Sequence, residues 1–195
     1  SFAFNGTGQL RMSDNASNRV VSTSDTVTNT AGHTIRGAGQ LGANSISVMH
    51  NDGTIIQEGA NALVLDVSGT FNNNNVLQAS GSGGIVLNAG TYNLGTIDVL
   101  AGSALKLNSQ ATTHDAVFNM AAGTFVDVVN SQAGAANLAI REATLNGTLR
   151  MDDGEGATFL NDLTNNGVVE LNSTGSLTDF RINSNAFSLQ GPGEI

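Results

Sequence analysis

The sequence of 195 residues predicts an all-β protein, a parallel β-helix (β-solenoid) with about 20 to 24 residues in each coil. Three observations favour this fold: short runs of alternating apolar and polar residues, a small-residue turn before most runs, and a nearly constant spacing of the turns. Hardly any stretch keeps the apolar period of a helix for three turns. We expect one domain, residues 1–195, with the right-handed coil that is the default for parallel crossovers.

The alternating runs are the expected strands. In "ALVLDV" (62–67), Leu63, Leu65 and Val67 fall on one side, with Val64 and Asp66 on the other. The same alternation occurs in "ALKLN" (104–108), "FVDVV" (125–129), "TLRMD" (148–152) and "VVELN" (168–172). A period of two residues is typical of half-buried strands.

The turns set the period. One turn per repeat gives Gly32, Gly53, Asn74, Gly95 or Gly102, Gly123, Gly147 and Gly167. The interval from Gly95 to Gly123 is longer than the others and contains "NSQATTHDA" (108–116). This interval is either a loop bulging from one coil or two strand sides of one coil counted separately.

A glycine motif needs a separate interpretation. "RGAGQLG" (36–42) contains G-x-G-x-x-G, the spacing of a dinucleotide-binding loop. However, G-x-G followed by Gln or Glu and an aliphatic residue occurs three times, beginning at Gly6, Gly37 and Gly191, and no helical pattern follows Gly42. We interpret the motif as a corner where the backbones of successive coils pack closely, which only glycine permits.

Stacked coils should align like residues in ladders. We expect the side chains of Asn72 to Asn75 to form hydrogen bonds along such a ladder. The outward residues of four consecutive strands are Lys106, Asp127, Arg150 and Glu170, whose charges alternate in sign. Their spacing predicts a charge ladder on one face.

The composition excludes several classes of partner. The formal charge at pH 7 is −9, from 16 acidic and seven basic residues, so a nucleic-acid partner is not expected. No apolar run is long enough to span a bilayer, so we expect no membrane insertion by this segment. The chain has no Cys, which excludes disulfides and thiolate metal sites.

Catalytic motifs are absent from the sequence. His33, His50 and His114 are isolated, so we interpret them as surface or turn residues and expect no metal site. No G-x-S-x-G motif occurs, and we assign no catalytic residue.

The densest acidic group, "MDDGEG" (151–156), makes Asp152, Asp153 and Glu155 the candidate binding residues. We interpret it as an acidic surface turn, with Ca²⁺ as the alternative ligand and no other cofactor.

Several units resemble repeats of bacterial surface β-helix proteins, namely autotransporter passenger domains and large haemagglutinin-type adhesins. These units are "HNDGTIIQEGANALVLDVSG", "NLGTIDVLAGSALKLN" and "TLNGTLRMDDG", and the similarity of style covers most of residues 27–195. The resemblance implies secretion to the extracellular space or bacterial cell surface, and a rod that presents a binding surface for cell attachment. It implies no particular binding residue.

We therefore expect a segment of an adhesin, a fragment of a longer rod without evident caps, and no enzyme. The expected partner is a glycan or a host or cell-surface protein, with self-association as a further candidate. The loops expected at 108–116 and 152–156 would carry specificity.

Two alternatives remain. One is a polysaccharide-acting β-helix, a depolymerase or lyase of phage or bacterial origin, with Asp152, Asp153 or Glu155 as its acidic group. The other, ice or mineral binding by a threonine array, is disfavoured because Thr23, Thr26, Thr28 and Thr30 do not recur at the coil spacing in the sequence.

Overall fold

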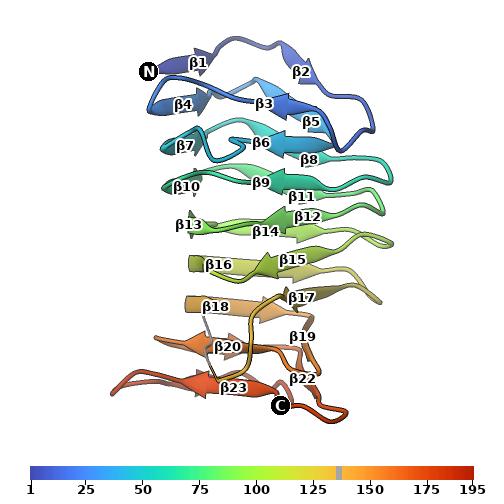
Figure 1. Cartoon of the computed structure of the whole chain (residues 1–195), viewed down its shortest axis with the longest axis vertical. Helices are drawn as coiled ribbons and strands as arrows, with labels where there is room; N and C mark the ends of the chain where they lie inside the picture. The colour runs from blue at the N-terminus through green and yellow to red at the C-terminus, as the bar shows by residue number, and fades with distance from the viewer. Residues whose placement is uncertain (135–137) are drawn as a thin grey trace.

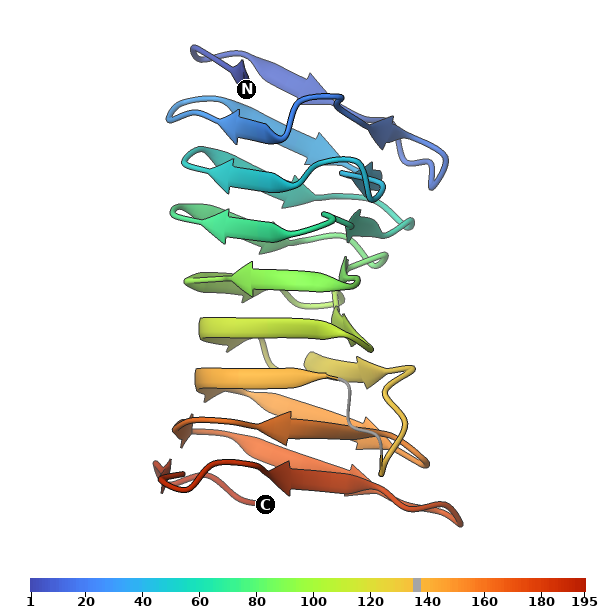
Figure 2. The same cartoon turned by 60° about the vertical axis from the view of Figure 1, so that its left-hand side comes forward.

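The chain coils into a β-solenoid of about eight turns, seen in a computed structural model that describes residues 1–134 and 138–195. All pairings between its strands are parallel, and each strand between the terminal coils pairs with strands of the coils above and below. Figures 1 and 2 show the coils stacked along the long axis, with the N-terminus at one end and the C-terminus at the other. The described residues contain no helix, and hence no helix that could cross a bilayer.

Three faces run along the solenoid. The first consists of β1 (Phe2–Phe4), β4 (Thr26–Asn29), β7 (Val48–Asn51), β10 (Thr70–Asn73), β13 (Gly90–Asn93), the first parts of β16 (Ala111–Met120) and β18 (Ala139–Asn146), β20 (Gly156–Phe159) and β23 (Asp179–Ile182). The second consists of β2 (Gln9–Arg11), β5 (Thr34–Gly37), β8 (Thr54–Gln57), β11 (Val76–Ala79), β14 (Thr96–Val99), the second parts of β16 and β18, β21 (Leu163–Asn165) and β24 (Leu189–Gln190). The third consists of β3 (Arg19–Val20), β6 (Gly39–Leu41), β9 (Leu63–Leu65), β12 (Ile85–Leu87), β15 (Leu105–Asn108), β17 (Phe125–Val129), β19 (Thr148–Asp152) and β22 (Val168–Asn172).

The core is a continuous apolar column because every second residue of each strand points inward. On the first face, Val27, Met49, Phe71 and Tyr92 stack in register and are almost fully buried. The Tyr92 hydroxyl donates a hydrogen bond to the Leu65 carbonyl oxygen at 2.7 Å, which satisfies its one polar group. Burial of these side chains is the main stabilising contribution.

The pairing of strands confirms the expected period. Ile35 pairs with Ile55 and Ile55 with Leu77, so these coils contain 20 and 22 residues. One later coil is longer, because Phe118 pairs with Leu145, 27 residues on.

The long interval before Gly123 arises because the turns at its two ends precede strands on different faces of the solenoid. This is the second of our two interpretations. Gly95 precedes β14 on the second face, whereas Gly123 precedes β17 on the third. The predicted loop at 108–116 is wrong, because most of it lies in β16, where residues such as Thr113 are buried. This strand turns the corner between two faces at Asp115, whose φ is 50°.

The glycine corner is confirmed for two of the three motifs. Gly37 and Gly39 have φ values of 117° and 125°, and a Cβ on either would collide with the Met12 or Asn18 carbonyl oxygen of the coil before. At Gly191, a Cβ would likewise collide with backbone of the preceding coil. At Gly6, nothing lies within 4 Å, so close packing does not explain that glycine.

Hydrogen-bonded asparagine ladders connect the coils, as predicted for Asn72 to Asn75. One ladder is buried: Asn29 Nδ2 donates to Asn51 Oδ1 at 2.8 Å, and Asn51 Nδ2 donates to Asn73 Oδ1 at 2.7 Å. On the outside, Asn93 donates to Asn72, and Asn74 donates to Asp52. Two longer outer ladders run Asp66, Asn88, Asn108, Asn130 and Asp98, Asn119, Asn146, Asn166.

The predicted charge ladder is in register: Lys106 pairs with Asp127, Asp127 with Arg150, and Arg150 with Glu170. Within it, the direct ion pair is Arg150 to Asp127, at 3.1 Å. Asp127 is buried rather than exposed, and the Arg150 guanidinium also lies over the Phe125 ring, 3.7 Å from its centroid. Arg150 therefore contacts both a carboxylate and an aromatic ring, whereas a simple surface ion pair provides the first contact alone.

Candidate functional site

The three acidic candidates lie together in sequence but have separate structural roles. Asp153, in the turn after β19, accepts hydrogen bonds at its Oδ1 from the backbone N–H groups of Thr174, Gly175 and Ser176, at 2.7, 2.8 and 2.7 Å. These bonds lower the pKa of the Asp153 carboxyl to about 2. The carboxylate therefore holds the turn of the next coil, and it stays ionised at neutral pH.

Asp152 and Glu155 have partners of their own. Asp152 ends β19, where its carboxylate accepts a hydrogen bond from Asn172 at 3.1 Å and lies 3.4 Å from Arg150 Nε. Glu155 Oε2 accepts the backbone N–H of Asp152 at 3.2 Å, and burial raises the pKa of this carboxyl. In residues 1–134 and 138–195, no group of three or more His, Asp or Glu side chains is placed to hold a metal ion.

A segment that the sequence did not predict packs on this turn. After β17 the chain descends along the solenoid (Figure 1), and Gln132 forms an antiparallel bridge with Glu155. The Ala133 N–H donates to the Gly154 carbonyl at 2.8 Å, and the Gly134 N–H donates to Asp179 Oδ2, also at 2.8 Å. The expected specificity loop at 152–156 is therefore a short turn, which β20 follows from Gly156.

One histidine is not a surface residue. His33 lies in a turn as expected, but it is buried, with its Nδ1 2.7 Å from Asn29 Oδ1 and its ring stacked on Phe4. It thus forms the N-terminal end of the buried asparagine ladder. His50 and His114 lie at half-exposed positions on the first face.

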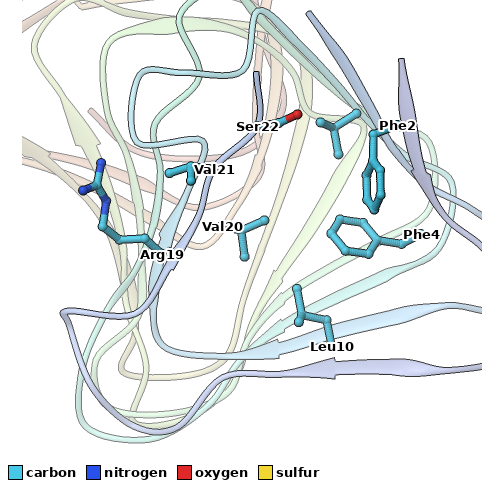
Figure 3. Close-up of a pocket in the computed structure, with 8 residues that line it drawn as sticks. Phe2, Phe4, Leu10, Arg19, Val20, Val21 and Ser22 are labelled. Carbon is cyan, nitrogen blue, oxygen red and sulfur yellow. The ribbon is translucent and has the colours of Figure 1, made fainter. Parts of the chain in front are cut away.

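A cavity of about 380 Å³ opens at the N-terminal end. Figure 3 shows Phe2, Phe4, Leu10 and Val20 pointing toward one another, while Arg19 points away. The lining is mostly apolar, with Arg19 and Ser22 as its polar members, and Phe4, Leu10 and Val20 pack against the core column. A lining with these side chains suits hydrophobic packing better than catalysis.

The first face carries a regular ladder on its outside. One ladder consists of Thr26, Val48, Thr70, Thr91, Thr112, Ala139 and Thr158, of which Thr158 is buried and the others are half-exposed. The expectation that Thr26 would not recur is wrong: Thr70 lies two coils further on, and Thr91 and Thr112 follow at intervals of 21 residues each, while Val48 takes the position between Thr26 and Thr70. We call this the threonine ladder.

Beside it runs a ladder of amides and imidazoles. Asn93 Nδ2 donates to Asn72 Oδ1 at 2.6 Å, and Asn72 Nδ2 lies 3.4 Å from His50 Nδ1. Together the two ladders form what we call the uncharged face, with the ten outward residues Thr26, Thr28, Val48, His50, Thr70, Asn72, Thr91, Asn93, Thr112 and His114. None of the ten is Asp, Glu, Lys or Arg.

The geometry of the uncharged face suits an extended, neutral ligand. Successive rows are about 4.8 Å apart, and each offers a methyl or hydroxyl group beside a polar side chain. Comparison with known proteins adds no relative: no protein-family model, curated protein or solved structure matches the chain.

Proposed function

We propose that the chain is a rod-forming segment of an extracellular bacterial adhesin, and that its uncharged face binds a neutral glycan. The observation that carries the proposal is the alignment of ten uncharged side chains over five coils. Threonine and valine methyl groups can pack on the C–H face of a sugar, while hydroxyl, amide and imidazole groups hydrogen-bond its hydroxyls. The net charge of −9 favours neutral over acidic glycans.

The solenoid itself supports a role in attachment. Its continuous core and inter-coil ladders make a stiff element that can hold a binding surface away from a cell. The predicted acidic residues are engaged in holding turns, so they do not supply an alternative binding site of comparable size.

Attachment to immobilised neutral polysaccharides tests the proposal. Replacing Thr70, Thr91 and Thr112 together by Lys should weaken binding by about tenfold or more, because the long charged side chains cover the uncharged face. The matched control replaces Thr54, Thr96 and Thr144 by Lys on the second face and should keep binding. Equal binding by the chain and both variants, or equal loss in both, would contradict the assignment of the face.

A polysaccharide-acting enzyme is the second candidate, and the raised pKa of Glu155 is the observation that favours it. A raised pKa keeps a carboxyl protonated to a higher pH, and a protonated carboxyl can donate a proton to a leaving group. Release of new reducing or unsaturated ends from a polysaccharide panel, abolished in Glu155→Gln, would establish this activity. A chain without turnover on substrates that a control depolymerase cuts would exclude it for those substrates.

A further inference from the structure

Arg141 continues the second ladder of the uncharged face. The parallel register of β16 and β18 pairs His114 with Arg141, so Arg141 takes the next position after His114 on the outside of the first face. Its side chain is half-exposed. The ladder of amides and imidazoles therefore leads to a guanidinium, which is the first formal charge on this ladder after Thr28.

The guanidinium of Arg141 has no partner in the part of the chain that the structure describes. Among the basic residues between the first and last coils, Arg36 pairs with Glu58 and Arg150 pairs with Asp127. Arg141 forms neither an ion pair nor a side-chain hydrogen bond with a described residue. A guanidinium offers five N–H donors in a planar fork that matches a carboxylate. Arg141 is thus equipped to bind an anion rather than to hold the fold.

The exposed part of the first face ends just beyond Arg141. On this face β18 is followed by β20, whose four residues are all buried, and Thr158 of the threonine ladder is one of them. The exposed rows of the two ladders therefore end at Ala139 and Arg141. A ligand that lies along the uncharged face meets Arg141 at the end of these rows.

Two exposed carboxylates restrict the charge that a ligand can carry at this end of the face. Asp115 directly follows His114, and Glu142 directly follows Arg141, at the corner where each strand leaves the first face. Both carboxylates, like the net charge of −9, repel an anion that extends over the corner. A ligand with one carboxylate, placed at Arg141, therefore fits better than a glycan that is charged along its whole length.

We propose that Arg141 binds a single carboxylate at one end of the glycan, so that the ligand is an acid-terminated oligosaccharide whose other sugars are neutral. The inference rests on the proposed function, because the neutral sugars lie on the uncharged face and only the terminal sugar reaches Arg141. The guanidinium donates two parallel hydrogen bonds to the two carboxylate oxygens. Arg141 is thereby a specificity-determining residue, which selects the charge of the ligand and fixes the direction of the bound chain.

Three matched forms of one oligosaccharide test the inference: the neutral chain, the chain with its reducing-end sugar oxidised to a carboxylate, and the chain with the primary hydroxyl of its non-reducing-end sugar oxidised to a carboxylate. Isothermal titration calorimetry compares the three forms for extended oligosaccharides of glucose, of mannose and of galactose. One of the two acids should bind about fivefold tighter than the neutral chain, because the direction of the chain decides which carboxylate reaches Arg141. The preference should shrink in about 0.5 M NaCl, which screens exposed charges.

Substitution of Arg141 assigns the preference to this residue. Arg141→Gln removes the charge and should abolish the preference, whereas Arg141→Lys keeps the charge without the planar fork and should retain part of it. Lys106→Gln is the matched control, because Lys106 also lacks an ion pair within the described residues but lies on the third face, so the preference should remain. Equal binding of all three forms, or a preference that survives Arg141→Gln, would overturn the inference and leave the proposed function standing. If no form of these chains binds, both proposals fail.

Discussion

At the scale of single residues, the buried asparagine ladder is the polar feature on which the core most depends. Asn51 is fully buried, accepts from Asn29, and donates to Asn73 Oδ1 and to the Val76 carbonyl at 2.9 Å. A buried amide with these partners stabilises the turn, but one missing member leaves its neighbours unsatisfied.

We predict that Asn51→Ala lowers the free energy of unfolding by about 2–4 kcal/mol, the cost of the cavity and of unpaired amide groups on both neighbours. Urea denaturation followed by circular dichroism measures the change. Asn74→Ala is the control: its side chain is exposed and donates one bond to Asp52, so its loss should cost less than about 1 kcal/mol. An equal loss of unfolding free energy in the two variants would show that burial of the ladder does not increase its contribution to stability.

Close packing between coils also depends on single glycines. A Cβ at Gly167 would collide with the Gly147 carbonyl oxygen of the preceding coil, whereas nothing lies within 4 Å of one at Gly175. Neither residue has the positive φ that would add backbone strain.

We therefore predict that Gly167→Ala lowers the melting temperature markedly, while Gly175→Ala leaves it unchanged or raises it slightly. Differential scanning calorimetry of the two variants decides between this steric explanation and a general requirement for glycine. If both variants melt at the same temperature as the parent chain, the backbones of successive coils do not approach each other closely at Gly167.

At the scale of elements, the connections between strands are held by carboxylates. Asp153 holds the turn between β22 and β23, and Asp14 holds the turn between β8 and β9, where the N–H groups of Ala60 and Asn61 donate to its carboxylate at 2.9 and 2.8 Å. Hydrogen bonds to the ionised form lower the pKa of both carboxyls.

This arrangement predicts a specific dependence on pH. Because the pKa of Asp153 falls from 3.8 to about 2 on folding, its stabilising contribution is fully present above about pH 4 and is lost as the pH falls through about 2. Asp153→Asn should therefore lower the urea midpoint at neutral pH, and the gap between variant and parent should close toward pH 2. A gap that is constant with pH would contradict the role of the ionised carboxylate.

The element scale also shows where reading the sequence failed. The polar run at 108–116 resembles a loop, yet Ala111 and Thr113 face the core and make it part of a strand. Small and polar residues can be tolerated inside a solenoid because the coils above and below supply most of the buried contacts. Their alternation is real, but their weak hydrophobicity conceals it.

At the scale of the whole molecule, the fold class, the repeat length and the charge ladder could all be predicted, since period-2 strands and regular turns are local signals. The uncharged face was not predicted, although Thr70, Thr91 and Thr112 recur every 21 residues, within the predicted period. Val48 interrupts the threonines between Thr26 and Thr70, and no single strand shows that its outward residues belong to a continuous face. The contact between Gln132 and the turn at Glu155 could not be predicted from the sequence either.

The central claim is that successive coils stack in the register that creates these ladders, and disulfide trapping tests it most directly. The chain has no Cys, so the only disulfide in a Val64→Cys, Val86→Cys variant would join ladder neighbours on β9 and β12. Neighbouring rows are about 4.8 Å apart, within the Cα range of a disulfide, whereas rows two coils apart are not. We predict rapid oxidation of this pair and none in Val64→Cys, Lys106→Cys. Oxidation of the second pair, or of neither, would contradict the stacking.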